Sequence, residues 1–272
     1  MTIKEALNHG AKRLQNQKEA RILLAHHLGC DALSLILKEA ESVEDVDAYL
    51  ALIERAKNSE PLEYITQEVS FYGENFFIKK GALIPRPETE ILIDKVLEVA
   101  KNIKNPKIAE IGVGSGIISI MIAKLRKDAT ITATDISKEA IEIAKTNAAR
   151  FGVAEQIRFI HTPYLIDIQQ KFDIIISNPP YIAEDAPLER NLAYEPDIAL
   201  FGGKKGDEIL KNIIDIAAYH DNCVLCCEMG YDQKEPLQRY IADKNLAQAR
   251  FYKDLAGFDR GFILKIGEKH QK

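Results

Sequence analysis

The fold is decided by one stretch, Lys107-Ile108-Ala109-Glu110-Ile111-Gly112-Val113-Gly114-Ser115-Gly116, which leads into the apolar run 117–125. The first half has the pattern of a buried strand, and the run that follows has the length and composition of a buried helix. Between them, glycines let the backbone turn tightly and approach a ligand closely. The helix N-terminus offers free N–H groups to polar or anionic atoms. This order of elements predicts a ligand-binding loop in an α/β fold.

A carboxylate stands where such a loop needs a partner. Asp135 lies 135 − 116 = 19 residues after Gly116, at the end of a second predicted strand. An acidic residue in that place usually accepts hydrogen bonds from a ribose diol. The alternative is an aspartate that caps the next helix, but Ser137 can itself serve as that cap. We therefore favour the ligand, which could be a nicotinamide dinucleotide or S-adenosylmethionine.

The glycine spacing separates these two ligands. Dinucleotide fingerprints read G-x-G-x-x-G, whereas Gly112, Gly114 and Gly116 give G-x-G-x-G. This spacing resembles the loop of class I methyltransferases, which wraps the methionine moiety of S-adenosylmethionine.

Helices and strands are predicted to alternate after Pro87, which implies a parallel sheet with helices on both faces. The predicted strands are 107–111, 130–134, 157–161, 172–177 and 223–229. Two further strands, 248–253 and 262–266, are too close in sequence for a crossover helix and must pair antiparallel. For residues 85–272 we predict an α/β, Rossmann-like class I methyltransferase domain, with a mixed sheet and an antiparallel C-terminal strand.

The chain before this domain has a different pattern. Residues 1–65 are predicted to form a small helical bundle, with a capping box at Thr2 and Glu5, a stop at Gly29 and a further helix starting at Ser42-x-x-Asp45. Few side chains there suit chemistry, so we assign this domain to substrate docking. Residues 66–84 are rich in aromatic and β-branched side chains and are predicted to form a β-hairpin linker that turns at Gly73 to Asn75.

Composition narrows the function classes. The 272 residues carry 36 basic and 41 acidic side chains, a formal net charge of −5, so nothing attracts the whole protein to nucleic acid. No apolar run approaches the roughly 20 residues of a membrane span, and the first residues do not resemble a signal peptide. The cysteines, Cys30, Cys223, Cys226 and Cys227, fit a reduced, cytoplasmic protein. They lack the partners of a zinc site, and we expect no metal.

The tetrapeptide Asn178-Pro179-Pro180-Tyr181 follows the predicted strand 172–177. Ligands of open α/β sheets bind beyond the carboxyl ends of the strands. The prolines fix φ and remove two N–H donors, which leaves the Asn178 side chain and the Pro179 carbonyl as acceptors in a stiff loop. Two acceptors suit a planar nitrogen with two hydrogens, and Tyr181 supplies a face for stacking. A rigid turn with an aromatic plug would explain the prolines but not the asparagine.

This tetrapeptide resembles the motif of the amino-methyltransferases, which methylate adenine, cytosine or glutamine nitrogens. Further segments resemble the release-factor glutamine N5-methyltransferases, the PrmC or HemK family, over nearly the whole chain. They are Leu83-Ile84-Pro85-Arg86-Pro87-Glu88-Thr89-Glu90, Phe71-Tyr72-Gly73, Tyr194-Glu195-Pro196, Leu200-Phe201-Gly202-Gly203 and Asp254-Leu255-Ala256-Gly257-Phe258-Asp259-Arg260. The family implies methyl transfer from S-adenosylmethionine, leaving S-adenosylhomocysteine. The acceptor is the glutamine of the Gly-Gly-Gln motif in class-1 peptide chain release factors.

The resemblance also implies the site residues. Asn178 and Pro179 would be catalytic, and together with Pro180 and Tyr181 they would bind the substrate. The residues implied for the cofactor are Gly112, Val113, Gly114, Ser115, Gly116, Asp135, Tyr164 and Asn178. Family members commonly have an aspartate before the aromatic at Tyr164, where this chain has Pro163. We expect Asp167 or a backbone group to replace that carboxylate.

Three alternatives differ in substrate or class. A sister family modifies a glutamine of a large-subunit ribosomal protein, but it usually has Arg-Ser-Pro in place of Arg86-Pro87-Glu88. A nucleic-acid adenine N6-methyltransferase would grip a flipped base with the same tetrapeptide. The net charge counts against that reading, and we expect neither a nucleic-acid nor a membrane partner. The intact loop, Asp135 and Asn178 argue against a protein that only binds.

Overall fold

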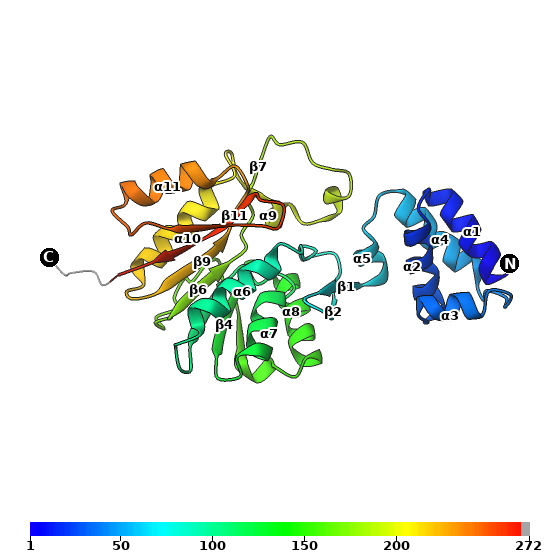
Figure 1. The fold of residues 1–272 in the computed structure, drawn as a ribbon, viewed down its shortest axis with the longest axis horizontal. Coiled ribbons are helices and arrows are strands. Elements are labelled where there is room, and N and C mark those ends of the chain that lie inside the picture. The colour runs from blue at the N-terminus through cyan, green and yellow to red at the C-terminus, as the bar shows by residue number, and fades with distance from the viewer. Residues whose placement is uncertain (268–272) are drawn as a thin grey trace. The chain divides into compact units, whose positions relative to one another are not determined.

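The computed structural model describes residues 1–267, which form two compact units. The first unit comprises Met1–Glu68 and Glu189–Tyr194, and the second comprises Val69–Leu188 and the chain from Glu195 onward. Figure 1 shows the helical N-terminal segment in blue to cyan and the α/β unit in cyan to red. The boundaries that the sequence suggests, after residues 65 and 84, stay predictions. The structure groups the chain from Val69 to residue 84 with the second unit.

The first unit is helical, as predicted. Its helices are α1 (Ile3–Leu14), α2 (Gln17–Leu28), α3 (Ala32–Leu37), α4 (Val46–Lys57) and α5 (Leu62–Thr66). The expected capping box forms at α1, where the Glu5 amide donates to Thr2 Oγ1 (3.2 Å) and the Thr2 amide donates to the Glu5 carboxylate (2.9 Å). Gly29 ends α2 in the left-handed conformation, with φ 62°. The helices enclose a core of their own, which includes Leu23, Leu24, Tyr49 and Ile53.

Two details of this unit differ from the prediction. Helix α4 begins after Asp45, whose carboxylate accepts the Ala48 amide, so Asp45 and not Ser42 is the cap. Ser42 instead forms an isolated bridge with Thr2. The short helices α3 and α5 were not predicted, because one or two turns give too little periodicity to recognise.

The second unit is built on a mixed sheet, which confirms the predicted class. Within residues 1–267 this sheet has seven strands in the order β10-β11-β9-β6-β3-β4-β5. The strands are β3 (Lys107–Ile111), β4 (Thr130–Asp135), β5 (Ile157–His161), β6 (Ile174–Ser177), β9 (Val224–Glu228), β10 (Arg250–Lys253) and β11 (Asp259–Lys265). Strand β11 pairs antiparallel with β9 and β10, while β5, β4, β3, β6 and β9 run parallel.

Most strand bounds lie within two residues of the prediction, and β11 is the exception. It begins at Asp259 rather than residue 262, because pairing with β10 continues past a bulge in β11: Tyr252 pairs with Gly261 and Lys253 pairs with Asp259, which leaves Arg260 as the extra residue. Such a bulge adds an unpaired residue and leaves no periodic signal in the sequence.

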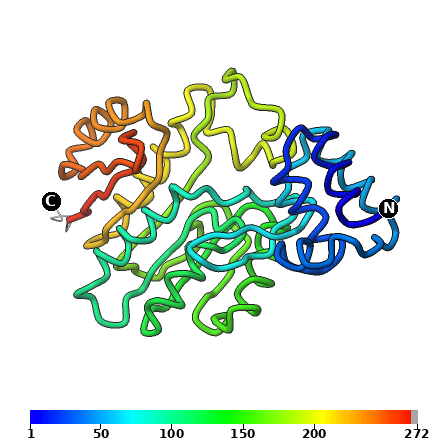
Figure 2. Tube along the Cα trace, turned by 45° about the vertical axis from the view of Figure 1, so that its right-hand side comes forward, coloured from blue at the N-terminus to red at the C-terminus, as the bar shows by residue number. Residues whose placement is uncertain are grey.

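Helices cover both faces of the sheet. Figures 1 and 2 show α10 (Glu208–Tyr219) and α11 (Lys234–Asp243) on one face, with α6 (Thr89–Ala100), α7 (Ile117–Leu125) and α8 (Lys138–Arg150) on the other. The sheet side chains that face α10 and α11 include Ile175, Leu225, Cys227 and Phe262, all fully buried. Cys223 and Cys226 are buried as well, as expected for strand core. None of the described helices combines the length and apolarity needed to cross a membrane.

Smaller elements fill the connections of the second unit. They are η1 (Ala154–Gln156), α9 (Asp197–Leu200) and the parallel pair β7 (Ile182–Ala183) and β8 (Phe201–Gly203), while η2 (Leu192–Tyr194) belongs to the first unit. The hairpin consists of β1 (Glu68–Phe71) and β2 (Glu74–Phe77). Its turn is Tyr72-Gly73 rather than Gly73 to Asn75, and both residues have positive φ, 52° and 75°. Two-residue hairpin turns of this kind match the twist of the strands.

Candidate active site

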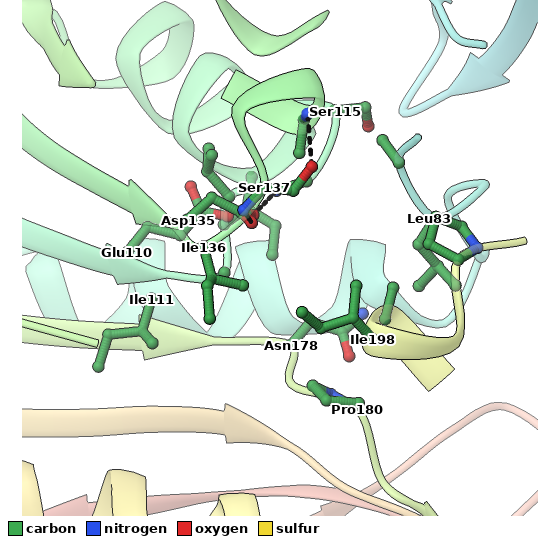
Figure 3. Close-up of a pocket in the computed structure, with 18 of the residues that line it drawn as sticks. Leu83, Glu110, Ile111, Ser115, Asp135, Ile136, Ser137, Asn178, Pro180 and Ile198 are labelled. Atoms are coloured by element: carbon green, nitrogen blue, oxygen red, sulfur yellow. Dashed lines mark hydrogen bonds between the residues drawn. The ribbon is translucent and has the colours of Figure 1, made fainter. Parts of the chain in front are cut away.

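A cavity of about 220 Å³ opens at the carboxyl ends of β3, β4 and β6. It is the place where ligands bind in open α/β sheets. Most residues expected at the site line it: Gly112, Val113, Gly114, Ser115, Asp135, Tyr164, Asn178 and Pro180. Figure 3 shows Asp135 and Ser137 on one side of the cavity and Asn178 and Pro180 on the other. The fold thus brings the glycine loop and the tetrapeptide, which are far apart in sequence, to the same cavity.

The glycine loop adopts a conformation that suits glycine. Gly112 and Gly114 have φ 77° and 53°, and no heavy atom lies within 4 Å of the place where either would carry a Cβ. Side chains at these positions would be strained, and the open space leaves the backbone accessible from the cavity. Gly116 (φ 87°) has a different task, because a Cβ there would lie 3.0 Å from the Ala144 Cβ in α8. It is needed for packing and does not line the cavity among the described residues.

Asp135 holds this loop to the end of β4. One carboxylate oxygen accepts the Gly114 amide (2.9 Å) and the other accepts the Ser137 amide (2.8 Å). Burial raises the pKa of Asp135, although these backbone hydrogen bonds act in the opposite direction. Ser137 caps α8 by accepting the Ala140 amide (3.1 Å). The capping alternative for Asp135 is therefore not what the structure shows, and its carboxylate keeps lone pairs that a ligand's hydroxyls can reach from the cavity.

Glu110, at the same edge of the sheet, has an incomplete hydrogen-bond shell. Its Oε2 accepts the Ser119 amide (3.0 Å) and the Ser119 hydroxyl, while Oε1 is buried without a partner. Burial raises the pKa of Glu110 to about 8. A buried polar atom without a partner is costly, and Glu110 lines the cavity. A ligand with an N–H donor would satisfy this oxygen.

Asn178 stands directly after β6, and its orientation is set by a neighbour. Its Nδ2 donates to Thr89 Oγ1 (3.1 Å) at the start of α6. Of the tetrapeptide, Asn178 and Pro180 line the cavity, while Pro179 and Tyr181 are not among the described residues that do. The Tyr181 hydroxyl points instead to Glu228 Oε1 (3.5 Å), and burial together with the Glu228 charge raises the pKa of Tyr181 to about 12. The roles expected of the four residues stay predictions.

Tyr164 lines the cavity beside Pro163, and its hydroxyl accepts a hydrogen bond from Asn212 Nδ2 (3.2 Å). Asp167, expected as a possible replacement for the missing carboxylate, is exposed and does not line the cavity in the described part of the chain. Exposed Ile136, 52% accessible, lines the cavity next to Asp135. The part of the cavity near Ile136 and Tyr164 is therefore lined by apolar and aromatic side chains, which suits a flat, weakly polar ring.

Sequence reasoning missed the residues that hold the tetrapeptide in place. Thr89 Oγ1 donates to Glu228 Oε2 (2.8 Å), and both residues are buried. Gln233 Nε2 donates to the carbonyls of Tyr181 and Gly206, both at 2.9 Å. A signal existed in the polar residues at the end of β9 and the start of α11, but pairing them with Thr89 requires the fold.

A second support lies in the segment 83–90. Arg86 donates to Glu195, which is 5% exposed, and the Ile84 amide donates to the same carboxylate (2.8 Å). These hydrogen bonds join two of the segments that carry the family resemblance. The two segments are more than 100 residues apart, and the sequence alone does not predict their contact. The same hydrogen bonds hold Leu83 and Pro85 at the cavity wall.

Two family models match this chain. Residues 5–66 match the PrmC N-terminal domain, and residues 87–193 match the methyltransferase small domain. Among solved structures, the N-terminal domain of human METTL16 in complex with SAH has a TM-score of 0.55, with 16% identity over 86% of this chain and 87% of that chain. This likeness agrees with the methyltransferase fold of the second unit.

Curated relatives extend the match along the sequence. The bifunctional methyltransferase of Rickettsia bellii is 34% identical over 95% of this chain, which spans only 54% of that longer protein. The release factor glutamine methyltransferase of Koribacter versatilis is 35% identical, and the match covers 89% of this chain and 91% of the relative. That of Clostridium botulinum is also 35% identical, with 90% of each chain covered. Because these matches take in both the helical unit and the methyltransferase unit, the chain belongs to the release factor glutamine methyltransferase family.

Proposed function

We propose that this protein transfers a methyl group from S-adenosylmethionine to the side-chain amide nitrogen (N5) of a glutamine. The glutamine is that of the Gly-Gly-Gln motif in class-1 peptide chain release factors. The observation that carries the proposal is the placement of Asn178, whose Nδ2 is bound to Thr89, at the edge of a cavity formed by the glycine loop and Asp135.

The residues around the cavity fit S-adenosylmethionine. The unpartnered Glu110 Oε1 suits an ammonium group, the Asp135 carboxylate suits the ribose hydroxyls, and Ile136 and Tyr164 suit the adenine. Gly112 and Gly114 leave open space beside the loop. When bound, the cofactor supplies a methyl group activated by its positively charged sulfur. The chain's own task is to hold the acceptor nitrogen in line with that group.

An amide nitrogen is a poor nucleophile, because its lone pair is delocalised into the carbonyl. Asn178 Oδ1 and the Pro179 carbonyl can accept both of its hydrogens, which favours the geometry where the lone pair points at the methyl group. These dipoles also stabilise the positive charge that develops on nitrogen. No strong base is required, since the methylated nitrogen becomes acidic and can lose its proton to solvent.

Substrate choice is assigned to the first unit. A glutamine side chain is small and supplies little selectivity, so discrimination needs contacts remote from the reacting atoms. The helical unit has a core of its own, and α3 leaves Leu33, Ile36 and Leu37 exposed at 62%, 61% and 76%. We assign this ridge to the body of the release factor. The four cysteines of the chain are free, which fits a cytoplasmic setting.

The test is transfer of tritium-labelled methyl from S-adenosylmethionine to purified release factor. A release factor whose Gly-Gly-Gln glutamine is replaced by alanine is the matched control, and it should take up no label. Ribosomal protein and DNA are offered in parallel. Faster labelling of the ribosomal protein would assign the function to the sister family, and salt-sensitive labelling of DNA would assign it to a nucleic-acid methyltransferase.

A further inference from the structure

Asn178 is linked to a buried carboxylate through one hydroxyl. Asn178 Nδ2 donates to Thr89 Oγ1 (3.1 Å), and Thr89 Oγ1 donates to Glu228 Oε2 (2.8 Å). Thr89 is 0% exposed and Glu228 is 1% exposed. The three residues come from different elements: the loop after β6, the first residue of α6 and the last residue of β9. Water has little access to the two inner groups, so each depends on the others for its hydrogen bonds.

The order of donors and acceptors in this chain is fixed from the carboxylate end. An ionised carboxylate only accepts hydrogen bonds, and a threonine hydroxyl has a single hydrogen. The Thr89 hydrogen is therefore used on Glu228, and Thr89 Oγ1 can only accept from Asn178. The asparagine must turn its NH₂ group to Thr89, which leaves Oδ1 for the ligand.

This orientation matters because the two ends of an asparagine amide are nearly equal in shape but opposite in hydrogen bonding. The acceptor nitrogen of a glutamine side chain carries two hydrogens and requires acceptors. An Asn178 amide turned by 180° would set one NH₂ group against another. The tetrapeptide alone does not exclude that orientation, since neither proline has an N–H group that could select the amide oxygen.

We propose that Thr89 and Glu228 are positioning residues that fix the orientation of the Asn178 amide, so that Oδ1 faces the nitrogen to be methylated. The inference rests on the proposed function, since it concerns the acceptor nitrogen of that reaction. Neither residue needs to touch the substrate for this effect. Burial raises the pKa of Glu228 to about 7, so assays are run above that pH, where the carboxylate is ionised.

The first test removes only the hydroxyl. Thr89→Val keeps the shape of the side chain but cannot bond to Asn178 or Glu228, whereas Thr89→Ser keeps the hydroxyl. We expect Thr89→Val to lower kcat for release factor about 10- to 100-fold, because misplaced groups at a reacting centre cost rates of this order. Thr89→Ser should recover most of that loss. Thr132→Val, at a threonine of β4 that is 3% exposed, is the matched control for loss of a buried hydroxyl and should stay close to wild type.

Binding separates orientation from general damage. Thr89 lines the cavity, but the polar groups assigned to the cofactor are those of Glu110 and Asp135. Calorimetry should therefore find S-adenosylmethionine affinity in Thr89→Val within about twofold of wild type. A parallel fall in affinity and melting temperature, not rescued by Thr89→Ser, would mean that Thr89 is only structural. An unchanged kcat in Thr89→Val, with wild type active, would overturn the inference and leave the proposed function standing.

The second test asks whether the two residues act as one unit. Glu228→Gln keeps the size of the side chain but can either donate or accept at Thr89, so the order of hydrogen bonds is no longer imposed. We expect an intermediate loss of kcat, and the double variant with Thr89→Val should be no slower than Thr89→Val alone. Losses that multiply would show independent roles and contradict the positioning chain. An inactive wild type would instead refute the proposed function.

Discussion

Asp135 combines two duties in one carboxylate, because it holds the glycine loop and faces the cavity. Asp135→Ala should weaken S-adenosylmethionine binding by about 2 kcal/mol, since hydrogen bonds to a charged carboxylate are stronger than hydrogen bonds between neutral groups. Isothermal titration measures this directly. Exposed Asp243 provides the control, and Asp243→Ala should bind like wild type. Unchanged affinity in a folded Asp135→Ala protein would remove Asp135 from the cofactor site.

Asn178 is predicted to matter for turnover far more than for folding. Its side chain is only half-buried, and the Asn178 amide donates a hydrogen bond to Thr89. Removal of one oriented polar group at a site of developing charge lowers kcat by about 10² to 10³. Single-turnover kinetics on Asn178→Ala should show this loss while the thermal unfolding midpoint moves little. A kcat near wild type would make the tetrapeptide a turn and nothing more.

Glu110 makes stability depend on pH. Burial raises its pKa from 4.5 to about 8 in the folded protein, so the fold disfavours the ionised form. Protonated Glu110 therefore contributes to the stability of the fold. This contribution is complete below the pKa of the unfolded chain and is lost as the pH rises through the pKa of the folded protein. Glutamine does not titrate. The unfolding free energy of wild type should therefore fall relative to that of Glu110→Gln as the pH rises from about 5 to about 8. The slope is at most about 1.4 kcal/mol per pH unit. Urea titrations at several pH values measure it, and parallel curves for the two proteins would contradict the prediction.

Helices α7 and α8 approach each other at a glycine, which gives a prediction at the level of elements. Alanine at Gly116 (φ 87°) would meet Ala144 and Ile120 at 3.0 Å, whereas Gly152 (φ 67°) has open space around it. Both substitutions carry the cost of a left-handed residue, roughly 1 to 2 kcal/mol. Only Gly116→Ala adds overpacking, about 1 to 3 kcal/mol more. Urea titration measures both losses of unfolding free energy. Equal losses in Gly116→Ala and Gly152→Ala would contradict the prediction and show that α8 moves away from the added methyl group.

The elements also show what sequence can predict. Strands β3 and β5 and helix α7 were predicted to the residue, because each is rich in apolar side chains and is bounded by turn or glycine signals. Helix α3 has 6 residues, and the start of β11 depends on a bulge, so local patterns do not reveal them. The Thr89–Glu228 bond joins residues 139 apart. Such a pairing follows from strand order and helix packing, which no single segment encodes.

At the scale of the whole molecule, docking and chemistry are predicted to be separable. Serines in place of Leu33, Ile36 and Leu37 should lower kcat/KM for intact release factor roughly tenfold or more, because each apolar side chain buried on docking contributes about 1 kcal/mol or more. Methylation of a short Gly-Gly-Gln peptide should not change. Leu125→Ser, at a residue 48% exposed in α7, controls for surface substitution. Equal loss on peptide and protein, or no loss on either, would refute the docking ridge.

The first unit is discontinuous in sequence, since Glu189–Tyr194 joins Met1–Glu68, and the Tyr194 hydroxyl donates to the Asn58 carbonyl (2.9 Å). This limits how recombination can exchange recognition modules among relatives. A recombination crossover near residue 68 would replace the N-terminal helices but keep residues 189–194, which are adapted to the helices that were replaced. Productive chimeras should therefore carry two fragments, and evolutionary changes at residues 189–194 should accompany changes near Asn58 rather than changes in the catalytic loops that flank them.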